Sequence, residues 1–494
     1  MYPTLENIRE IAAKGQYKRV PVCREVYADR YTPVEVMRTL RKASRHCYLL
    51  ESASQTEVWG RYSFLGYEPV MEITCTDGCM KIRHTEVGND EVVTKQVAHP
   101  GDTLREILKE YKSPVMEEMP PFTGGLVGYF SYDYIKYSEP KLKLGEHEDP
   151  DFRDMDLMLF DQVIAFDHYR QKVLLITGVM LDDLEKSYQK AEKKLQEMAD
   201  LIRDGEKEEF PSLKLASEIK PQFPKEKYCE MVEKAKHYIH EGDIFQVVLS
   251  NPMRAKAEGS LFDTYRVLRA TNPSPYMFYF SSDDIELAGA SPETLVKLED
   301  KKLTTFPLAG TRPRGKTREE DQELEAGLLK DEKELAEHNM LVDLGRNDIG
   351  KISRYGSVKV TEYMAVHKYS KIMHICSKVV GNLEPGKDAL DAIEAVLPAG
   401  TLSGAPKIRA CQIIEDLEKE ERGIYGGAIG YIDFAGNMDT CIAIRMAVKK
   451  DGMVYVQAGG GIVADSVPQK EYEESANKAA AVMQAVLQAE EEAL

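Results

Sequence analysis

The sequence contains no long apolar run. Nowhere in its 494 residues is there a stretch approaching the roughly 20 apolar residues that a membrane-spanning helix needs. The first twenty residues, MYPTLENIREIAAKGQYKRV, also lack the apolar core of a secretory signal. We therefore expect a cytoplasmic protein with no membrane partner.

Positive charge and paired cysteines are also scarce. Lysine and arginine number 65 against 83 aspartates and glutamates, which leaves a formal net charge of -18. Such a surface repels a phosphate backbone, so we expect no nucleic-acid partner. Of the eight cysteines only Cys75 and Cys79 lie close together, without the paired spacing of a zinc site. We expect reduced, mostly structural thiols.

Apolar runs separated by polar turns predict a mixed order of strands and helices. In the first half, the runs CYLLESAS, MEITC, GGLVGYFSYDY, LMLFDQVIAFD and KVLLITGVML predict a largely antiparallel sheet. A helical segment from residue 181 gives way to the breaker-rich PSLKLASEIKPQFP, which predicts two domains, 1–215 and 216–494. Later, a helical stripe over 228–239 precedes the strand IFQVVLS, and DTCIAIRMAV and MVYVQAG flank a hairpin turn, KKDG.

Four glutamates recur at helical spacing in two segments. Glu334 and Glu337 share one face of a predicted helix in KDEKELAEHNMLVDL, and Glu471 and Glu474 share a face after Pro468. If the two helices face each other, four carboxylates converge. Mg²⁺ would then bind one or two of them directly and the others through water. Two solvated acidic helix faces remain the alternative on these residues alone.

A glycine run and an arginine suggest an anion site. Residues 459–461 in AGGGIVADS lie between a predicted strand and the last helix, where glycines let backbone N–H groups approach a carboxylate; a plain glycine turn has the same pattern. Strand alternation places Arg445 on a face of small residues with Cys441, Ala443 and Ala447. A guanidinium there suits a carboxylate ligand or an internal salt bridge.

The segment GTRPRGKT at 310–317 fits the P-loop pattern literally. However, Pro307 interrupts the strand that should precede such a loop, and Pro313 removes one backbone donor. Because the surrounding pattern is not βαβ either, we do not expect a nucleotide site here.

Taken together, these segments resemble the chorismate-utilising enzymes, and nearly the whole chain is similar to their anthranilate synthase large subunits. The matching blocks are LLES at 49–52, NPSPYMF at 272–278, GASPETLV at 289–296, PLAGTRPRG at 307–315, DEKELAEHNMLVDLGRND at 331–348, LPAGTLSGAPK at 397–407, GIYGGAIGY at 423–431 and QAGGGIVADSVPQKEYEES at 457–475. The resemblance implies an α+β fold of two large packed antiparallel sheets with surrounding helices. It also implies an N-terminal domain with regulatory elements and a C-terminal chorismate-binding catalytic domain. The family has glycine-alanine-glycine where this chain has three glycines.

The resemblance assigns roles to individual residues. The implied Mg²⁺ ligands are Glu337 and Glu471 directly, with Glu334 and Glu474 holding metal-bound water. Glu293 matches the general acid that protonates the departing 4-hydroxyl, and His374 matches the histidine associated with pyruvate elimination. The positions that match contacts to chorismate carboxylates are Tyr425, Arg445, Gly459, Gly461 and Lys478, and Thr311 and Thr401 match other pocket positions.

The implied reaction has two stages. Ammonia attacks C2 of chorismate while the 4-hydroxyl leaves with acid assistance, which gives 2-amino-2-deoxyisochorismate. Proton abstraction and elimination of pyruvate then produce anthranilate. Metal and arginine act mainly by positioning and charge stabilisation, and Glu293 must stay protonated near neutral pH, which burial would favour.

Two positions separate the possible activities. Relatives that add water to chorismate have a water-activating lysine where this chain has Gln246, which has no titrating group and suits ammonia. Many aminodeoxychorismate synthases have a lysine that forms a covalent intermediate at the position of Ala309, where alanine cannot do so. An aminodeoxychorismate synthase without that lysine remains the second candidate. A tryptophan-binding sensor without catalytic turnover is the candidate from another class, although the intact acidic set argues against it.

The resemblance also implies regulation and a partner. The positions that match a tryptophan-binding site for feedback inhibition are Glu51, Ser52, Pro275, Tyr276 and Met277; without the resemblance they indicate a buried strand and a proline-rich turn. The sequence has no G-x-C-x-G segment for the nucleophilic cysteine of a glutamine amidotransferase. We therefore expect a separate amidotransferase subunit that supplies ammonia, often in a heterotetramer.

Overall fold

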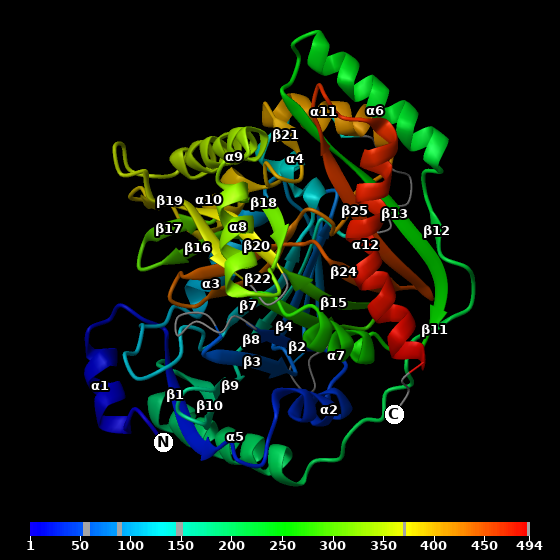
Figure 1. The fold of residues 1–494 in the computed structure, drawn as a ribbon. Helices are drawn as coiled ribbons and strands as arrows, with labels where there is room; N and C mark the ends of the chain where they lie inside the picture. Colours follow the sequence, from blue (N-terminus) through cyan, green and yellow to red (C-terminus); the bar gives the residue numbers. More distant parts are fainter. Residues whose placement is uncertain (53–59, 86–90, 145–151, 369–371, 492–494) are drawn as a thin grey trace.

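Two large sheets dominate the structure. The computed structural model describes residues 1–52, 60–85, 91–144, 152–368 and 372–491. Within these ranges the strands form one 13-stranded and one 12-stranded sheet, with helices around them (Figure 1). The neighbouring strands of both sheets are antiparallel. This confirms the predicted α+β fold.

The larger sheet combines strands from both halves of the chain. Its order is β1 (Arg19–Tyr27), β10 (Lys172–Met180), β9 (Val163–Asp167), β3 (Tyr62–Tyr67), β2 (Cys47–Glu51), β14 (Tyr276–Ser281), β15 (Ile285–Ser291), β24 (Met446–Lys450), β25 (Met453–Ile462), β13 (Gln246–Glu258) and β11 (Lys214–Leu215). Two short strands also pair with β13: β12 (Lys220–Pro221) and β21 (Gly404–Ala405).

The smaller sheet combines the two halves in the same way. Its order is β18 (Leu308–Pro313), β20 (Ile372–Asn382), β17 (Lys302–Thr305), β16 (Thr294–Glu299), β23 (Met438–Ile442), β22 (Ala428–Asp433), β7 (Gly125–Phe130), β8 (Met155–Phe160), β4 (Met71–Thr76), β5 (Cys79–His84) and β6 (Val92–Gln96). β19 (Lys359–Lys368) pairs with β20. Because β2 pairs with β14 and β7 with β22, both sheets continue across residue 215. The division into two domains there stays a prediction.

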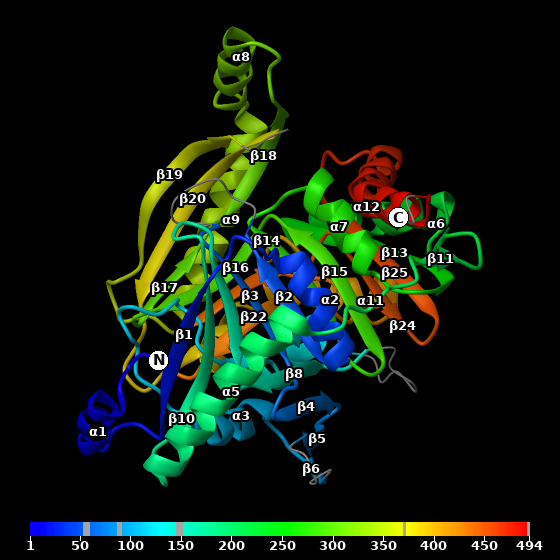
Figure 2. The same cartoon turned by 90° about the horizontal axis from the view of Figure 1, so that it is seen from below.

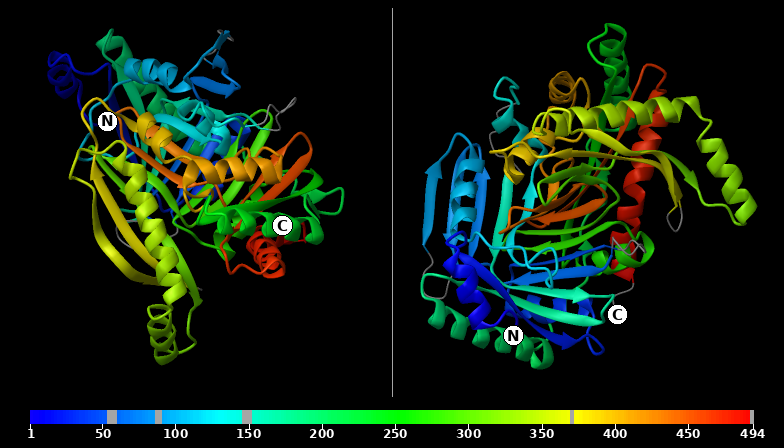
Figure 3. Two further views of the ribbon diagram at one scale, coloured as in Figure 1. Left: turned by 90° about the horizontal axis from the view of Figure 1, so that it is seen from above. Right: turned by 90° about the vertical axis from the view of Figure 1, so that its left-hand side faces the viewer.

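Helices cover the outer faces of the sheets. Their bounds are α1 (Leu5–Ala13), α2 (Pro33–Ala43), α3 (Pro100–Glu110), the 3₁₀ turn η1 (Tyr132–Tyr134), α4 (Ile135–Ser138), α5 (Leu184–Asp204), α6 (Lys225–His240), α7 (Phe262–Thr271), α8 (Arg318–Leu328), α9 (Glu332–Gly350), α10 (Ala389–Val396), α11 (Lys407–Glu418) and α12 (Pro468–Glu491). Figure 3 shows α5 lying along the strands nearest the N-terminus. In the part of the chain that the structure describes, no helix combines the length and apolarity needed to cross a membrane.

Apolar side chains form three principal layers. Tyr48, Phe160, Phe278 and Met446 belong to the core between the two sheets, since they come from strands of both. A second core joins the larger sheet to α2, α5, α7 and α12, and a third joins the smaller sheet to α3, α9 and α10. The inner face of each sheet is therefore closed to solvent over most of its length, and polar groups between the sheets are confined to a few positions.

The segment that fits the P-loop pattern is not a phosphate cradle. Residues 308–313 form β18, paired with β20, and α8 begins after Thr317. The next backbone N–H groups already have acceptors, because Gly315 donates to Asp321 at 2.9 Å and Lys316 to Glu320 at 2.8 Å. Figure 2 shows α8 projecting from one end of the molecule.

Candidate active site

Two crossovers between the sheets lie side by side at the centre of the candidate site. The chain passes from β15 in the larger sheet to β16 in the smaller one, and returns from β23 to β24. Backbone hydrogen bonds join these crossovers. Ile442 donates to the carbonyl of Glu293 at 3.0 Å, and Ala290 donates to the carbonyl of Arg445 at 3.1 Å. The backbone itself thus holds an acid and a guanidinium close together.

The prediction that Arg445 lies on one continuous strand is wrong. The segment DTCIAIRMAV is divided between β23 and β24, which belong to different sheets. Arg445 lies between them with a φ of 51°, in the left-handed region. The alternation of side chains predicted one strand, because the segment has no glycine or proline that marks the break between β23 and β24. Burial lowers the pKa of Arg445, and the nearby Glu293 carboxylate opposes that change.

Glu293 is the best-placed acid. Thr401, between α10 and β21, donates its hydroxyl to Glu293 Oε1 at 3.1 Å, and both residues line a cavity of about 40 Å³. Burial raises the pKa of Glu293 to about 7, while the Thr401 hydroxyl and the charges of Arg445 and Lys478 lower it. A carboxyl that titrates near neutrality can donate a proton at physiological pH.

His374 and Thr311 face each other on neighbouring strands. They are register partners in β20 and β18, and Thr311 Oγ1 lies 3.0 Å from His374 Nδ1. The Gly310 carbonyl lies 3.3 Å from the same nitrogen. Burial and the charge of Arg445 lower the pKa of His374, although the Gly310 carbonyl raises it. The imidazole is therefore neutral at pH 7 and can accept a proton.

The four glutamates share one electrostatic environment. A methyl group added at Gly460 would lie 3.4 Å from Glu471 Oε2 and 3.9 Å from Glu474 Oε1, so both carboxylates of α12 approach β25. Burial raises the pKa of Glu337, and Glu334 and Glu474 raise it further. Burial and Glu474 likewise raise the pKa of Glu471. The charge of Glu474 on α12 thus reaches Glu337 on α9.

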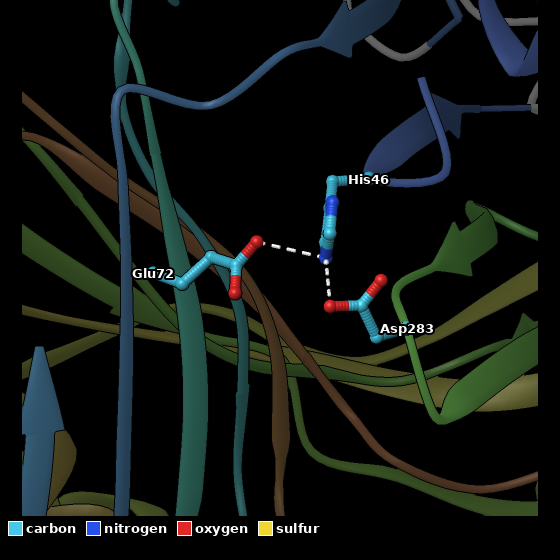
Figure 4. Close-up of side chains that lie close together, drawn as sticks. All are labelled: His46, Glu72 and Asp283. Atoms are coloured by element: carbon cyan, nitrogen blue, oxygen red, sulfur yellow. Dashed lines mark ion pairs between the residues drawn. The ribbon is translucent and has the colours of Figure 1, made fainter. Parts of the chain in front are cut away.

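Within the described ranges, no three of these four carboxylates have oxygen atoms that all lie within 4.8 Å of one another. Among the described residues, the group of three side chains whose donor atoms all lie within 4.8 Å of one another is a different one, His46, Glu72 and Asp283. His46 Nε2 lies 2.8 Å from Glu72 Oε1 and 3.5 Å from Asp283 Oδ2 (Figure 4). Arg83 lies 2.9 Å from Asp283 and supplies the positive charge there. This network of ion pairs links the two sheets and lies outside the candidate site.

The glycine run lies in a strand rather than in a loop after it. Residues 459–461 form the end of β25 and pair with β13, which corrects the sequence prediction. Glycine is required there because a methyl group at Gly459 would lie 2.3 Å from a backbone oxygen of β13, and one at Gly461 would lie 2.2 Å from Gln246 Nε2. Lys478 on α12 donates to the Gly459 carbonyl at 3.2 Å. Gln246 is buried, and its Oε1 has no hydrogen-bond partner in the part of the chain that the structure describes.

A buried ion pair supports Tyr425 and Thr401. Arg422 lies 2.6 Å from Glu418, and both side chains are almost fully buried. The guanidinium also donates to the carbonyl of Leu402 at 2.6 Å and lies 6.0 Å from the centroid of the buried Tyr425 ring. Sequence analysis missed this pair because glutamate and arginine four residues apart are usual on exposed helix surfaces.

The residues implied to bind tryptophan meet at one cavity. A cavity of about 350 Å³ is lined by Glu51, Ser52, Pro275, Tyr276 and Met277. β2 and β14 bring them together, since Glu51 and Met277 are register partners. Sequence analysis missed two partners of the Tyr276 hydroxyl, Asp439 at 2.8 Å and Thr294 at 2.9 Å. Thr294 lies in the block GASPETLV, but nothing in that motif links it to Tyr276, and Asp439 lies in none of the matching blocks.

Comparisons with known proteins identify the family of the chain. Residues 45–484 match the family described as chorismate binding enzyme. Anthranilate synthase component 1 of Aquifex aeolicus (strain VF5) is 44% identical over 99% of this chain and 98% of that protein. The corresponding protein of Acetivibrio thermocellus is 43% identical over 99% of both chains. The chain belongs to the anthranilate synthase component 1 family of chorismate-binding enzymes.

Solved structures extend the comparison. The crystal structure of anthranilate synthase component I from Streptococcus pneumoniae TIGR4 is 41% identical in sequence and has a TM-score of 0.75, covering 86% of this chain and 92% of that chain. The menaquinone-specific isochorismate synthase from Escherichia coli is 19% identical with a TM-score of 0.69 over 98% of both chains, and at that identity it shows the fold alone. The family resemblance that the sequence motifs indicated is confirmed.

Proposed function

We propose that the chain is the large subunit of an anthranilate synthase and converts chorismate and ammonia to anthranilate and pyruvate. The observation that carries the proposal is the position of Glu293. This acid, with its pKa raised to about 7, lies on a crossover that is bonded to the one carrying Arg445. The relatives named anthranilate synthase component 1 point to the substrate.

Cationic and neutral groups around Glu293 suit a dicarboxylate substrate. Arg445 and Lys478 are both close enough to Glu293 to lower its pKa, so a carboxylate bound between them would lie beside the acid. Thr311, Tyr425, Gly459 and Gly461 complete this proposed binding surface. Glu293 would donate its proton to the leaving 4-hydroxyl, while Thr401 keeps the carboxyl oriented. Such proton donation typically contributes a rate factor of about 10² to 10⁴.

Gln246 and His374 have complementary roles in this proposal. The buried Gln246 Oε1, which has no partner among the described residues, can accept a hydrogen bond from ammonia, and the side chain has no titrating group that could activate water. This favours amination over hydration of chorismate. The neutral imidazole of His374 takes the ring proton in the second stage, when pyruvate is eliminated.

Mg²⁺ is part of the proposal. The glutamates supply the oxygen ligands that a hard divalent cation prefers, and a cation would relieve the repulsion that raises the pKa of Glu337 and Glu471. These two would hold it directly, with Glu334 and Glu474 acting through water. When bound, the ion supplies positive charge that orients a substrate carboxylate.

Ammonia would come from a second protein. The relatives' name, component 1, indicates another component, and this sequence has no G-x-C-x-G segment for glutamine hydrolysis. We propose a cytoplasmic heterotetramer with a glutamine amidotransferase subunit, in which free ammonia can replace glutamine.

Tryptophan would inhibit the enzyme from the cavity of about 350 Å³. The cavity combines a carboxylate, Glu51, with the aromatic and apolar walls of Tyr276 and Met277, which suits the ammonium group and indole ring of that amino acid. The hydroxyl of Ser52 is a further polar group at the site.

The experiment is a turnover assay with the purified chain. Chorismate, Mg²⁺ and ammonium should yield anthranilate, followed by fluorescence, together with pyruvate, and EDTA should stop the reaction. Glu293→Gln should lower the rate by about 10² or more. Glu299→Gln, six positions later at the far end of β16, should leave it unchanged. Accumulation of aminodeoxychorismate would replace the proposal with the second candidate. Absence of turnover combined with tight tryptophan binding would favour a sensor.

A further inference from the structure

A hydrogen bond links the cavity of about 350 Å³ that Tyr276 lines to the candidate active site. The Tyr276 hydroxyl, in the larger cavity, lies 2.9 Å from Thr294 Oγ1. Thr294 is buried, follows Glu293 directly in the chain, and lines the small cavity that holds the Glu293 carboxyl. One hydrogen bond thus connects a residue that faces the proposed inhibitor to the residue next to the proposed acid.

The backbone near Thr294 can transmit a displacement. Thr294 begins β16 opposite Cys441, and the register shifts before Val296, so the strand is irregular where it meets the crossover. Cys441 lines the larger cavity, and its neighbour Ile442 donates to the Glu293 carbonyl. A displacement of the residues that line the larger cavity can therefore reach Glu293 in two ways, through the side chain of Thr294 and through the backbone of β23.

A second route from Tyr276 leads to the same crossover. Tyr276 is the register partner of Ser291 across β14 and β15. The Ser291 hydroxyl donates to the Ile442 carbonyl at 2.7 Å and accepts from the Glu293 backbone N–H at 3.4 Å. The Glu293 backbone is thus bound on both sides by groups adjoining Tyr276.

Glu51, another polar residue of the larger cavity, has its hydrogen-bond partners away from Glu293. Glu51 accepts hydrogen bonds from Ser63 at 3.1 Å and from Arg269 at 2.8 Å, and it also contacts Tyr265. Arg269 and Tyr265 belong to α7, on the outer face of the larger sheet. Glu51 therefore anchors the cavity to the helix layer, away from Glu293.

We infer that Thr294 is the positioning residue through which occupancy of the Tyr276 cavity controls the orientation of Glu293. This inference rests on the proposed inhibition by tryptophan and adds its route. In the free enzyme, Thr294 holds Tyr276 while Glu293 is bonded to Thr401. A ligand that binds the Tyr276 hydroxyl, or moves β14, favours a second arrangement in which Thr294 turns the acid away from Thr401. The ligand must bind the two arrangements with different affinity, and the coupling is reciprocal.

The test is Thr294→Val, which removes the hydroxyl and keeps the shape. Tryptophan binding, measured by calorimetry, should stay within about threefold of wild type, whereas the maximal inhibition of the ammonia-dependent rate should fall at least about fivefold. In wild type, tryptophan should lower kcat because it reorients Glu293. In Thr294→Val, tryptophan should no longer lower kcat. Thr294→Ser keeps the hydroxyl and should restore inhibition. Thr294→Ala provides a second deletion if the valine variant does not fold.

Thr305→Val is the matched control. Thr305 lines the same small cavity and bonds the Leu295 carbonyl at 3.0 Å, so its substitution disturbs the wall without touching the Tyr276 bond. It should remain fully inhibited. If tryptophan binds and inhibits Thr294→Val as it does wild type, the inference is wrong but the proposed inhibition by tryptophan stands. Failure of tryptophan to bind wild type would remove the proposed inhibition and the inference together.

Discussion

The backbone N–H of Ile442 donates to the backbone carbonyl of Glu293 at 3.0 Å. This bond joins the outgoing crossover between the sheets to the returning one, so the acid and Arg445 are positioned by main-chain contacts. Neither crossover can move alone without breaking a buried hydrogen bond, which costs about 1–3 kcal/mol when a buried polar group is left without a partner. The geometry of the site therefore depends on how the two sheets are positioned relative to each other.

The pH dependence of the reaction should report the Thr401–Glu293 contact. Burial raises the pKa of Glu293 to about 7 and the Thr401 hydroxyl lowers it. The acid form exists below this pKa, so the rate at fixed free ammonia should fall as pH rises through about 7. Thr401→Val removes a donor to the ionised form and should move the falling limb upward by roughly 0.5 to 1 pH unit.

Thr305→Val is also the control for this pH profile, because Thr305 borders the same cavity and donates to a carbonyl rather than to Glu293. The rate of Thr305→Val should fall over the same pH range as that of wild type. A limb that moves downward in Thr401→Val would show that the hydroxyl does not stabilise the ionised carboxylate.

The three glycines of β25 should differ sharply in their tolerance of alanine. A methyl group at Gly459 would lie 2.3 Å from a backbone oxygen, and Gly459→Ala should lose about 1–3 kcal/mol of unfolding free energy. Gly461→Ala should displace Gln246, 2.2 Å from the added methyl, and reduce turnover. Gly460→Ala meets its nearest atom at 3.4 Å and should stay within about 0.5 kcal/mol of wild type.

Urea unfolding and turnover of the three variants decide this prediction. Gly460→Ala is the internal control, because the family that this sequence resembles has alanine at that position. Equal losses at all three positions would contradict the close approach of β13 to β25.

Local patterns in the sequence predicted elements better than their partners. The helical stripe at 228–239 forms α6, and MVYVQAG forms the second strand of the predicted hairpin, in β25. The division of DTCIAIRMAV was missed because it depends on which sheet each half joins, and the pairing of β2 with β14 joins residues more than 200 positions apart. Pattern alone carries no information on such distant contacts.

The candidate site shows the same limit. The resemblance named Glu293 and Tyr276 from short motifs, yet the motif that contains each residue does not contain that residue's own partners. Thr401 lies about a hundred residues after Glu293 and Asp439 far beyond Tyr276 in the chain, and only the folded sheets bring each pair within hydrogen-bonding distance. Motifs therefore named candidate residues one by one, but they did not predict which of these residues contact one another.

Removal of divalent metal should expose the repulsion among the glutamates. Burial and neighbouring carboxylates raise the pKa of Glu337 in the folded state. The folded state then binds more protons, so the metal-free protein loses stability as pH rises from the unfolded pKa through the folded one. In EDTA at pH 8, Glu337→Gln should therefore have a higher Tm than wild type.

Mg²⁺ should reverse this order. Saturation at a hundred times Kd stabilises by about 2.7 kcal/mol, and wild type should gain most of this while Glu337→Gln gains little. Glu332→Gln, exposed in the first turn of the same helix, is the control and should respond to Mg²⁺ as wild type does. An unchanged Tm of wild type on adding Mg²⁺ would refute the metal site independently of activity.

The buried Glu418–Arg422 pair should contribute more to stability than any exposed pair near it. Glu418 accepts from Arg422 and from the Ser250 backbone N–H at 2.7 Å, so Glu418→Ala leaves a buried guanidinium without its partner. Loss of one member of such a pair costs about 3–5 kcal/mol. The neighbouring Arg254–Glu420 pair is about one-third exposed, 30% and 38%, and Glu420→Ala should cost less than about 1 kcal/mol.

Activity should fall together with stability in Glu418→Ala, because Arg422 also holds the Leu402 carbonyl beside Thr401. Urea unfolding measures the first effect, and chorismate turnover well below the unfolding transition measures the second. Replacing both Glu418 and Arg422 by methionine should recover part of the stability, since no buried charge is then left unpaired, but it should not recover turnover, because the contact that orients the Thr401 segment is still missing. Recovery of turnover by the double replacement would show that the pair acts on stability alone.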